Sequence, residues 1–341
     1  MKIFIFGAGA SKGSQEGYSP NVLAPLVDEI FNETYQDFAN QVGVEKGEIE
    51  GFRNDFILSG KGLEEWLTDL WERYTKSAAE ITQRRYQAIF GRTTFYIWWL
   101  MQKVSQTYNH QNGYKLFLDK LSEEGEDYGF INFNYDTLLD RALVDTGYNL
   151  GGTLTSYADA KYFKPHGSVN WFLKKRPEDQ TISGEEIYDN LARYRLAANA
   201  MYSGSQIPFN LTVLEPSHHD LTRPDIIHSG NFGNQYAFPF ILIPLASKLY
   251  DRIETYKENI VDRATELVSG AKDIYLIGYR ANDDLIKDIF ASVNNAKLHV
   301  VGHEHAQDIQ KGVLSWATTL KVGKIYNNGF TDFINTYGDN Q

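Results

Sequence analysis

The stretch MKIFIFGAGASKG, residues 1–13, decides the fold that we expect for this chain. Residues Ile3 to Phe6 are apolar and β-preferring, and so short a run indicates a buried strand rather than a helix. The strand leads directly into five small residues, Gly7, Ala8, Gly9, Ala10 and Ser11. The two glycines leave no Cβ between the backbone and a ligand. A helix beginning after Ser11 would point its free N–H groups at a pyrophosphate lying over this turn.

Two interpretations of this glycine turn stay open. A lone Gly-x-Gly is typical of nucleotide phosphate loops, but it also occurs in ordinary strand-to-helix turns. The dehydrogenase fingerprint is not matched, because Lys12 stands where the third glycine belongs. Asp28 and Glu29 lie in a helical pattern, not at the end of a second strand. The turn therefore predicts a dinucleotide without predicting hydride transfer.

Length and composition indicate a globular protein with a substantial core. The chain has 341 residues, 42% of them hydrophobic, and a formal net charge of −11, which argues against broad nucleic-acid binding. It has no cysteine, so disulfides, thiolate metal sites and a cysteine nucleophile are excluded. The amino terminus has the pattern of a strand rather than a signal peptide, and no apolar run has the length of a membrane span. We therefore expect a soluble, cytoplasmic protein that does not contact a membrane.

The pattern along the chain predicts an α/β fold. The expected strands cover residues 3–6, 128–134, 162–173 with a break at Pro165, 238–245, 273–277, 297–301 and 324–326. The expected helices cover residues 21–41, 63–74, 82–108, 114–121, 137–146, 185–201, 250–269, 284–294 and 306–320. The aromatic residues of the third helix, Phe95, Tyr96, Trp98 and Trp99, are expected in the core or at a subunit contact. Strands that alternate with helices predict a parallel sheet covered by helices on both faces.

Ligands of such sheets bind at the carboxyl ends of the strands, so the loops there are candidate sites. After the second strand come Asn134 and Asp136. Asp136 is a good cap for the next helix, whereas an amide such as Asn134 can hold a ribose hydroxyl or a water. His166 lies between Pro165 and Gly167, where it is either a general base near neutral pH or part of a structural turn.

Two later loops carry weaker signals. Gly278 and Tyr279 follow the strand at 273–277, and Asp283 or Asp284 is expected to cap the next helix. His303 and His305 follow the strand at 297–301, but no third ligand has a suitable spacing, so we expect a solvated loop or an adenosine contact and no metal. The motifs of P-loop NTPases, zinc proteases and esterases do not occur.

Four short motifs, in this order, resemble the sirtuin-like family. They are Gly7-Ala8-Gly9-Ala10-Ser11, Asn134-Tyr135-Asp136, His166-Gly167-Ser168 and Gly278-Tyr279. More specifically, the chain resembles the bacterial sirtuin-like NAD hydrolases (NADases) of antiphage defence. Deacetylating sirtuins carry a four-cysteine zinc module and usually a glutamine before the catalytic asparagine. This chain has no cysteine and has Phe133 at that position, which favours NAD+ cleavage over deacetylation.

The resemblance implies a Rossmann-like NAD-binding domain, formed by residues 1–30 and 122–341. A polar insertion would cover residues 174–235, and a helical insertion residues 31–121. NAD+ would be the substrate, and no metal would be needed. The resemblance also implies a homo-oligomer and a separately encoded sensor or activator protein.

The resemblance assigns roles to particular residues as well. Asn134 and His166 match the family's catalytic residues. The turn from Gly7 to Ser11 would hold the pyrophosphate, and the remaining NAD-binding positions would be Asp136, Gly167, Gly278 and Tyr279. The residues leave open two alternatives: a module that senses NAD or ADP-ribose without cleaving it, and an ADP-ribosyl transferase or cyclase.

Overall fold

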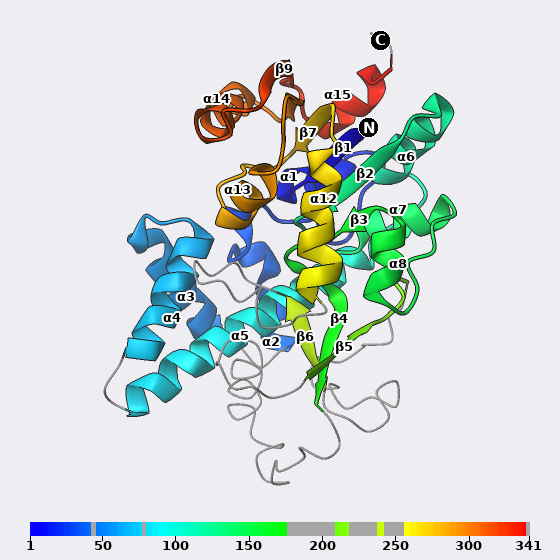
Figure 1. The fold of residues 1–341 in the computed structure, drawn as a ribbon. Helices are drawn as coiled ribbons and strands as arrows, with labels where there is room; N and C mark the ends of the chain where they lie inside the picture. The colour runs from blue at the N-terminus through cyan, green and yellow to red at the C-terminus, as the bar shows by residue number, and fades with distance from the viewer. Residues whose placement is uncertain (42–45, 77–79, 176–208, 218–236, 242–255, 339–341) are drawn as a thin grey trace.

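The computed structural model describes residues 1–41, 46–76, 80–175, 209–217, 237–241 and 256–338 (Figure 1). Its centre is a six-stranded sheet in the order β3-β2-β1-β7-β8-β9, in which all neighbours are parallel. The strands are β1 (Lys2–Phe6), β2 (Tyr128–Asn132), β3 (Tyr162–Phe163), β7 (Asp273–Ile277), β8 (Lys297–Val301) and β9 (Lys321–Tyr326). The predicted α/β class, a Rossmann-like parallel sheet, is confirmed.

Strand order and register place three loops side by side. From β1 the chain continues to β2 on one side of the sheet, while β7 lies on the other side. Phe6, the last residue of β1, is in register with Asn132 of β2 and Ile277 of β7. These three strands therefore end at one level, and in open α/β sheets whose strand order reverses in this way ligands bind at that point.

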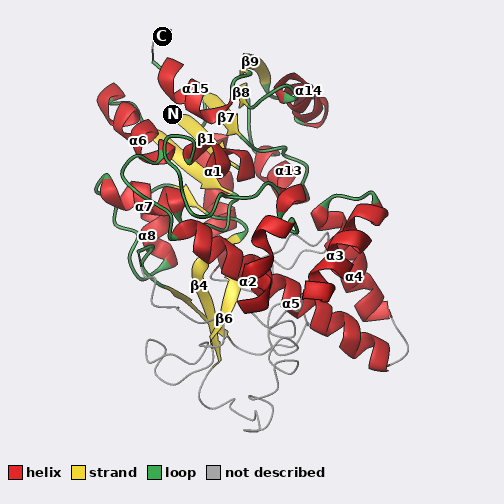
Figure 2. Cartoon of the chain, turned by 180° about the vertical axis from the view of Figure 1, so that it is seen from behind, coloured by secondary structure: helices red, strands yellow, loops and turns green. Residues whose placement is uncertain are grey.

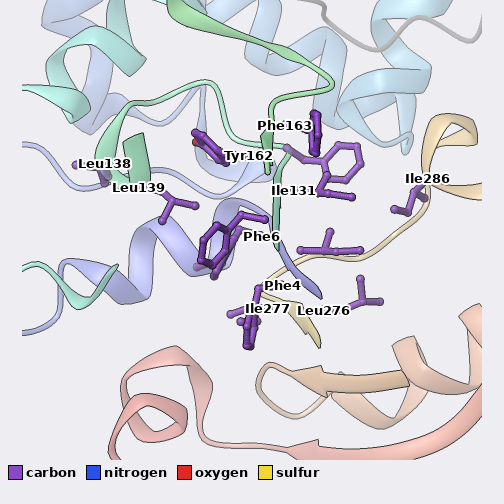
Figure 3. Packing of buried hydrophobic residues seen from close by; sticks show 14 of the residues in the cluster. Phe4, Phe6, Ile131, Leu138, Leu139, Tyr162, Phe163, Leu276, Ile277 and Ile286 are labelled. Carbon is purple, nitrogen blue, oxygen red and sulfur yellow. The ribbon is translucent and has the colours of Figure 1, made fainter. Parts of the chain in front are cut away.

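Helices cover both faces of the sheet, as predicted. On one face, Phe4 and Phe6 pack edge-on against Phe117 of α6. On the other, Leu267 of α12 lies against Gly129 of β2. The first face carries α1 (Ala8–Ser14), α6 (Gly113–Glu124) and α15 (Gly329–Thr336), and α12 (Arg263–Ser269) on the second packs against α13 (Asp284–Phe290). The buried side chains of Phe4, Phe6, Ile131 and Leu276 line the core between these layers (Figure 3).

A second, antiparallel sheet has the strand order β5-β4-β6. Its strands are β4 (Gly167–Lys175), β5 (Phe209–Val213) and β6 (Ala237–Ile241). The extended stretch expected at 162–173 is thus divided at Pro165, with β3 in the large sheet and β4 in the small one. The described part of the strand expected at 238–245 corresponds to β6 and belongs to this second sheet, and residues 242–245 lie outside the described residues. The helix expected at 185–201 lies outside the described residues.

Between β1 and β2 the chain is helical, with α2 (Gln36–Gln41), α3 (Lys46–Ser59), α4 (Leu63–Lys76) and α5 (Glu80–Ser105) (Figure 2). The predicted helices at 63–74 and 82–108 correspond to α4 and α5. Trp98 and Trp99 of α5 are each 1% exposed, and Trp98 Nε1 donates to the Val169 carbonyl of β4. These aromatic residues therefore form core. The division into domains stays a prediction, and α6 crosses the boundary expected at residue 121.

The helix predicted for residues 21–41 is wrong in its first half. Residues 21–26 are not helical, and short 3₁₀ turns at Val27–Glu29 and Glu33–Tyr35 lead into α2. Side chains take the backbone donors that a helix would use, because Gln15 accepts from the Ala24 N–H and Glu29 from the Leu26 N–H.

Other helices differ from expectation in their bounds. Residues 257–262 form a π-helical turn before α12, and residues 250–255 of the helix expected there are not described. Helices α7 (Leu138–Asp145) and α14 (Ala306–Trp316) match expected ones, whereas α8 (Leu154–Asp159) and α15 were not expected. None of the helices in the described ranges has the length and apolar character needed to span a membrane.

Candidate active site

The loops after β1, β2 and β7 meet at the carboxyl end of the sheet. The Phe133 N–H donates to the Phe6 carbonyl, and the Gly7 N–H donates to the Ile277 carbonyl, at 2.9 and 3.0 Å respectively. The predicted motifs at Gly7, Asn134 and Gly278 are therefore neighbours, although more than a hundred residues separate each from the next.

The glycine turn differs from expectation in one respect, because helix α1 begins at Ala8 rather than after Ser11. Gly7 is the N-cap, in an extended conformation (φ −127°, ψ −173°), with no side chain to cap the helix. Tertiary contacts hold the start of the helix instead, and the first of them satisfies a free N–H group. The Gly9 N–H donates to the Gly278 carbonyl at 3.0 Å, and the Gly7 carbonyl accepts from Asn134 Nδ2 at 2.9 Å.

The glycines of this region allow the loop after β7 to lie directly on the start of α1. A Cβ on Gly7 would come within 2.7 Å of the Gly278 oxygen and of Tyr279 Cβ. Gly278 has a φ of +59°, and a Cβ there would collide with the Ala10 nitrogen. The Cβ side of Gly7, expected to be open to a pyrophosphate, is therefore covered by Gly278 and Tyr279.

Asn134 faces the glycine turn. The residue is 7% exposed, and its Nδ2 donates to the Gly7 carbonyl and to Ser11 Oγ, at 2.9 Å in each case. A carbonyl can only accept, so the amide nitrogen must be on this side. Both amide hydrogens are engaged, and Oδ1 is the atom left to accept a bond from a ribose hydroxyl or a water.

Asp136 links α1 to the start of α7. Its Oδ2 accepts from Ser11 Oγ at 2.8 Å, and its Oδ1 accepts from the Leu138 N–H at 3.1 Å, although the N-cap residue of α7 is Thr137 rather than the expected Asp136. Burial raises the pKa of this carboxyl, and the charge of Lys164 acts in the opposite direction. Asp136 thus holds two helices in place beneath the glycine turn.

Lys164 is a member of the site region that the sequence did not single out. Its Nζ donates to the Asp136 carbonyl at 2.6 Å and to Asp140 Oδ2 at 2.9 Å, and both charged side chains are 0% exposed. Asp140 also accepts from the hydroxyls of Tyr157 and Tyr162. The signal for this network was a lysine between an apolar strand and Pro165, but its partners come from distant segments.

His166 is buried with one ring nitrogen unused. The residue is 4% exposed, and its Nε2 has no hydrogen-bond partner. In the Nδ1–H tautomer of this imidazole, the Nε2 lone pair is free to accept a proton. Burial lowers the pKa of His166, while the charge of Asp283 raises it.

Tyr279 and Asp283 complete the surroundings of His166. The Tyr279 ring stacks on Phe133, with 4.4 Å between ring centroids. The imidazole of His166 also packs against Phe133, in an edge-on arrangement with 4.8 Å between centroids. The Tyr279 hydroxyl donates to Asp283 Oδ2, and that oxygen lies 4.0 Å from His166 Nε2. Asp283 is also the N-cap of α13, as expected, and accepts from the Ile286 N–H.

Gly167 points away from this group. Its φ is +78°, and a Cβ there would collide with the Phe240 carbonyl of β6, so a glycine is required for packing of the second sheet. Its role in NAD+ binding stays a prediction. His303 and His305 are exposed, and the described residues hold no cluster of three or more His, Asp or Glu side chains that could bind a metal.

Comparison with known proteins yields structures but no sequence family. No protein-family model and no curated protein matches the chain. A solved structure titled "Sir2-p53 peptide-NAD+" aligns at 14% identity and a TM-score of 0.42, over 99% of this chain and 92% of that one. A structure of "Sir2 bound to acetylated peptide" aligns over the same shares at 13% identity and a TM-score of 0.42. Likeness at this level does not place the chain in a family.

Proposed function

We propose that this chain is an NAD+ hydrolase that cleaves the nicotinamide–ribose bond to give nicotinamide and ADP-ribose. The observation that supports this proposal best is His166, a buried imidazole whose Nε2 is an unused proton acceptor. It lies beside the loops after β1, β2 and β7, where the strand order of the sheet favours a bound dinucleotide. Function still depends on the residues of the site and not on the fold.

Hydrolysis of this bond needs a group that orients the water or the ribose and a group that accepts a proton, and residues of the site can supply both. The bond from the anomeric carbon to the nicotinamide nitrogen breaks, and its electron pair leaves with nicotinamide. Positive charge develops on the ribose, and a water oxygen bonds to the anomeric carbon. Asn134 Oδ1 would orient this water or a ribose hydroxyl, and His166 Nε2 would accept the proton that is released.

The cellular part of the proposal rests on the resemblance of the four motifs to the NAD hydrolases of antiphage defence. The protein would act in bacterial antiphage defence by depleting cytoplasmic NAD+. It would work as a homo-oligomer and respond to a separately encoded sensor or activator. No metal takes part in this scheme.

Nicotinamide release from NAD+ tests the proposal. The chain is assayed alone and together with the proteins encoded beside it. His166→Ala is expected to lose about 10²–10⁴-fold in rate, the usual contribution of general acid–base catalysis. Asn134→Ala, which removes the group that orients the water or the ribose, is expected to lose about 10²-fold. Asp119→Ala and Asn335→Ala alter exposed side chains away from the strand ends and serve as controls with wild-type rates.

The other possible outcomes of this assay would each indicate a different function for the chain or different catalytic residues. Wild-type rates in both site variants would refute the assignment of Asn134 and His166. Saturable NAD+ binding without nicotinamide release in the activated assembly would indicate a sensing module. Cyclic ADP-ribose or an ADP-ribosylated acceptor, detected by mass spectrometry, would indicate a cyclase or a transferase.

A further inference from the structure

One carboxylate oxygen lies between two groups of the candidate site. Asp283 Oδ2 accepts the hydroxyl of Tyr279 and lies 4.0 Å from His166 Nε2. The other oxygen, Oδ1, is engaged by the Ile286 N–H at 2.9 Å. Asp283 is 7% exposed, so water screens its charge only weakly. Oδ2 is therefore the carboxylate oxygen that both the Tyr279 hydroxyl and the His166 imidazole approach.

The other titratable side chains around His166 are two tyrosines and a lysine that is directed elsewhere. Tyr135, from the loop after β2, lies 6.1 Å away between ring centroids. Tyr256, at the start of the π-helical turn, donates its hydroxyl to the Pro165 carbonyl. Lys164 precedes His166 by two residues, but its ammonium group is directed at Asp136 and Asp140. Within the described residues, Asp283 is the carboxylate that lies 4.0 Å from the imidazole, and its charge favours the protonated ring.

Tyr279 is placed so that it can give way. It is half-buried, and its ring is held by stacking on Phe133 and by the bond to Asp283. The loop that carries it contains Ala281 at a φ of +55°, a left-handed conformation that costs a residue with a Cβ roughly 1–2 kcal/mol. A ligand on the Cβ side of Gly7 needs the space that Tyr279 fills, because Cβ and Cδ2 of Tyr279 each lie 2.7 Å from the position of a Gly7 Cβ.

We propose that Asp283 is a positioning residue for His166 and that Tyr279 competes with the imidazole for the same carboxylate oxygen. This inference rests on the proposed role of His166 as proton acceptor. With Tyr279 in place, its hydroxyl neutralises part of the Asp283 charge and the imidazole stays uncharged. When a ligand displaces Tyr279, the full carboxylate charge acts on His166 and stabilises the imidazolium that forms as Nε2 takes a proton. Ligand entry and proton acceptance are thereby coupled.

A double-mutant cycle read by NMR tests this coupling without any substrate. The pKa of His166 is measured from its imidazole resonances in the full chain, assigned by their loss in His166→Gln. Asp283→Asn keeps a good N-cap residue for α13 and removes the charge, so the pKa of His166 should fall. Tyr279→Phe keeps the stacking ring and removes the hydroxyl, so the pKa should rise. In the double variant, Tyr279→Phe should have no further effect.

Matched controls separate this effect from general disturbance. Asp284→Asn removes the neighbouring carboxylate, whose side chain is 73% exposed, and Tyr326→Phe removes a hydroxyl at the end of β9. Neither should shift the His166 titration. Thermal unfolding verifies that each variant is folded, and Asp283→Ser, which also caps a helix, replaces Asp283→Asn if that variant is not.

The proposal is overturned if the pKa of His166 is the same in wild type, Asp283→Asn and Tyr279→Phe. It is also overturned if Tyr279→Phe shifts this pKa as far in the Asp283→Asn background as it does with the native aspartate present. Both results are readable in a chain that never cleaves NAD+, so they are independent of the proposed reaction. In an active chain, the acid limb of the kcat/KM profile should move down in pH for Asp283→Asn and up for Tyr279→Phe.

Discussion

Two buried histidines of this chain, His166 and His299, differ in whether their ring nitrogens have hydrogen-bond partners. His166 follows β3 and is 4% exposed, and His299 lies within β8 and is 5% exposed. His299 pairs through Nε2 with Asp273 at 3.0 Å and accepts the Lys324 N–H on Nδ1 at 3.0 Å. His166 Nε2, in contrast, has no hydrogen-bond partner.

The difference separates a histidine that stabilises the fold from one that is available for chemistry. An unpaired buried polar atom costs about 1–3 kcal/mol. In His299 this cost is avoided, because the ring joins β8 to both β7 and β9. In His166 the cost is retained at the carboxyl ends of the strands, where a substrate hydroxyl or a water would supply the missing partner.

The largest effect on stability is expected beside His166, in the fully paired charges of Lys164 and Asp140. Lys164→Met leaves the buried Asp140 carboxylate without its cation and should lower the free energy of unfolding by about 3–5 kcal/mol. Lys115→Met, which breaks an i,i+4 pair on the surface of α6, should change it by less than about 0.5 kcal/mol. Urea unfolding measures both, and equal stabilities would show that the Lys164 pair contributes nothing.

An intermediate effect is expected from exchanging each histidine for phenylalanine. His299→Phe keeps a ring on Tyr275 but leaves the Lys324 N–H unpaired, so the free energy of unfolding should fall by about 1–3 kcal/mol. His166→Phe removes an already unpaired nitrogen and should cost less. Nicotinamide release should respond in the opposite order, with loss only in His166→Phe. A larger loss of stability in His166→Phe would invalidate the comparison.

The smallest expected effect is the dependence of stability on pH. Burial lowers the pKa of both histidines below the ordinary value of 6.5, so the unfolded chain binds protons more readily than the folded one. Stability should therefore decline as the pH falls below about 6.5, and the decline should end below the folded-state pKa values. Urea unfolding between pH 8 and pH 5 measures this decline, which should be smaller in His166→Phe and in His299→Phe. An undiminished decline in both variants would assign it to other groups.

Local patterns predicted the large sheet well. The apolar run before Gly7 and the alternation of strands and helices after residue 273 indicated β1, β7, β8 and β9. The first three of these strands are apolar and largely buried, whereas β9 at the edge of the sheet is exposed or half-buried throughout. The start of α1 was misplaced because no side chain caps it, and its first N–H groups are satisfied by Gly278 and by the Gly7 carbonyl. The region before α2 was misassigned because Gln15, nine residues away from Ala24, takes a backbone donor there.

The sequence also identified most residues around the candidate site, because small and polar residues that follow an apolar strand can be recognised without knowledge of the tertiary structure. It interpreted Asp283 only as a helix cap, because its distance to His166 depends on how two distant loops approach each other. Lys164 was not singled out for the same reason, since Asp140 lies on a different element.

The amino-acid sequence by itself determined the strands, the α/β class and the identity of the polar residues at the strand ends, because side-chain size, polarity and periodicity act locally. Only the tertiary structure decided which of those residues are satisfied and which is not. Asn134 bonds to the Gly7 carbonyl, and His166 lies beside Asp283, and in each case the two residues are more than a hundred positions apart in the chain. Burial then removes the water that would otherwise bond to any polar atom without a protein partner.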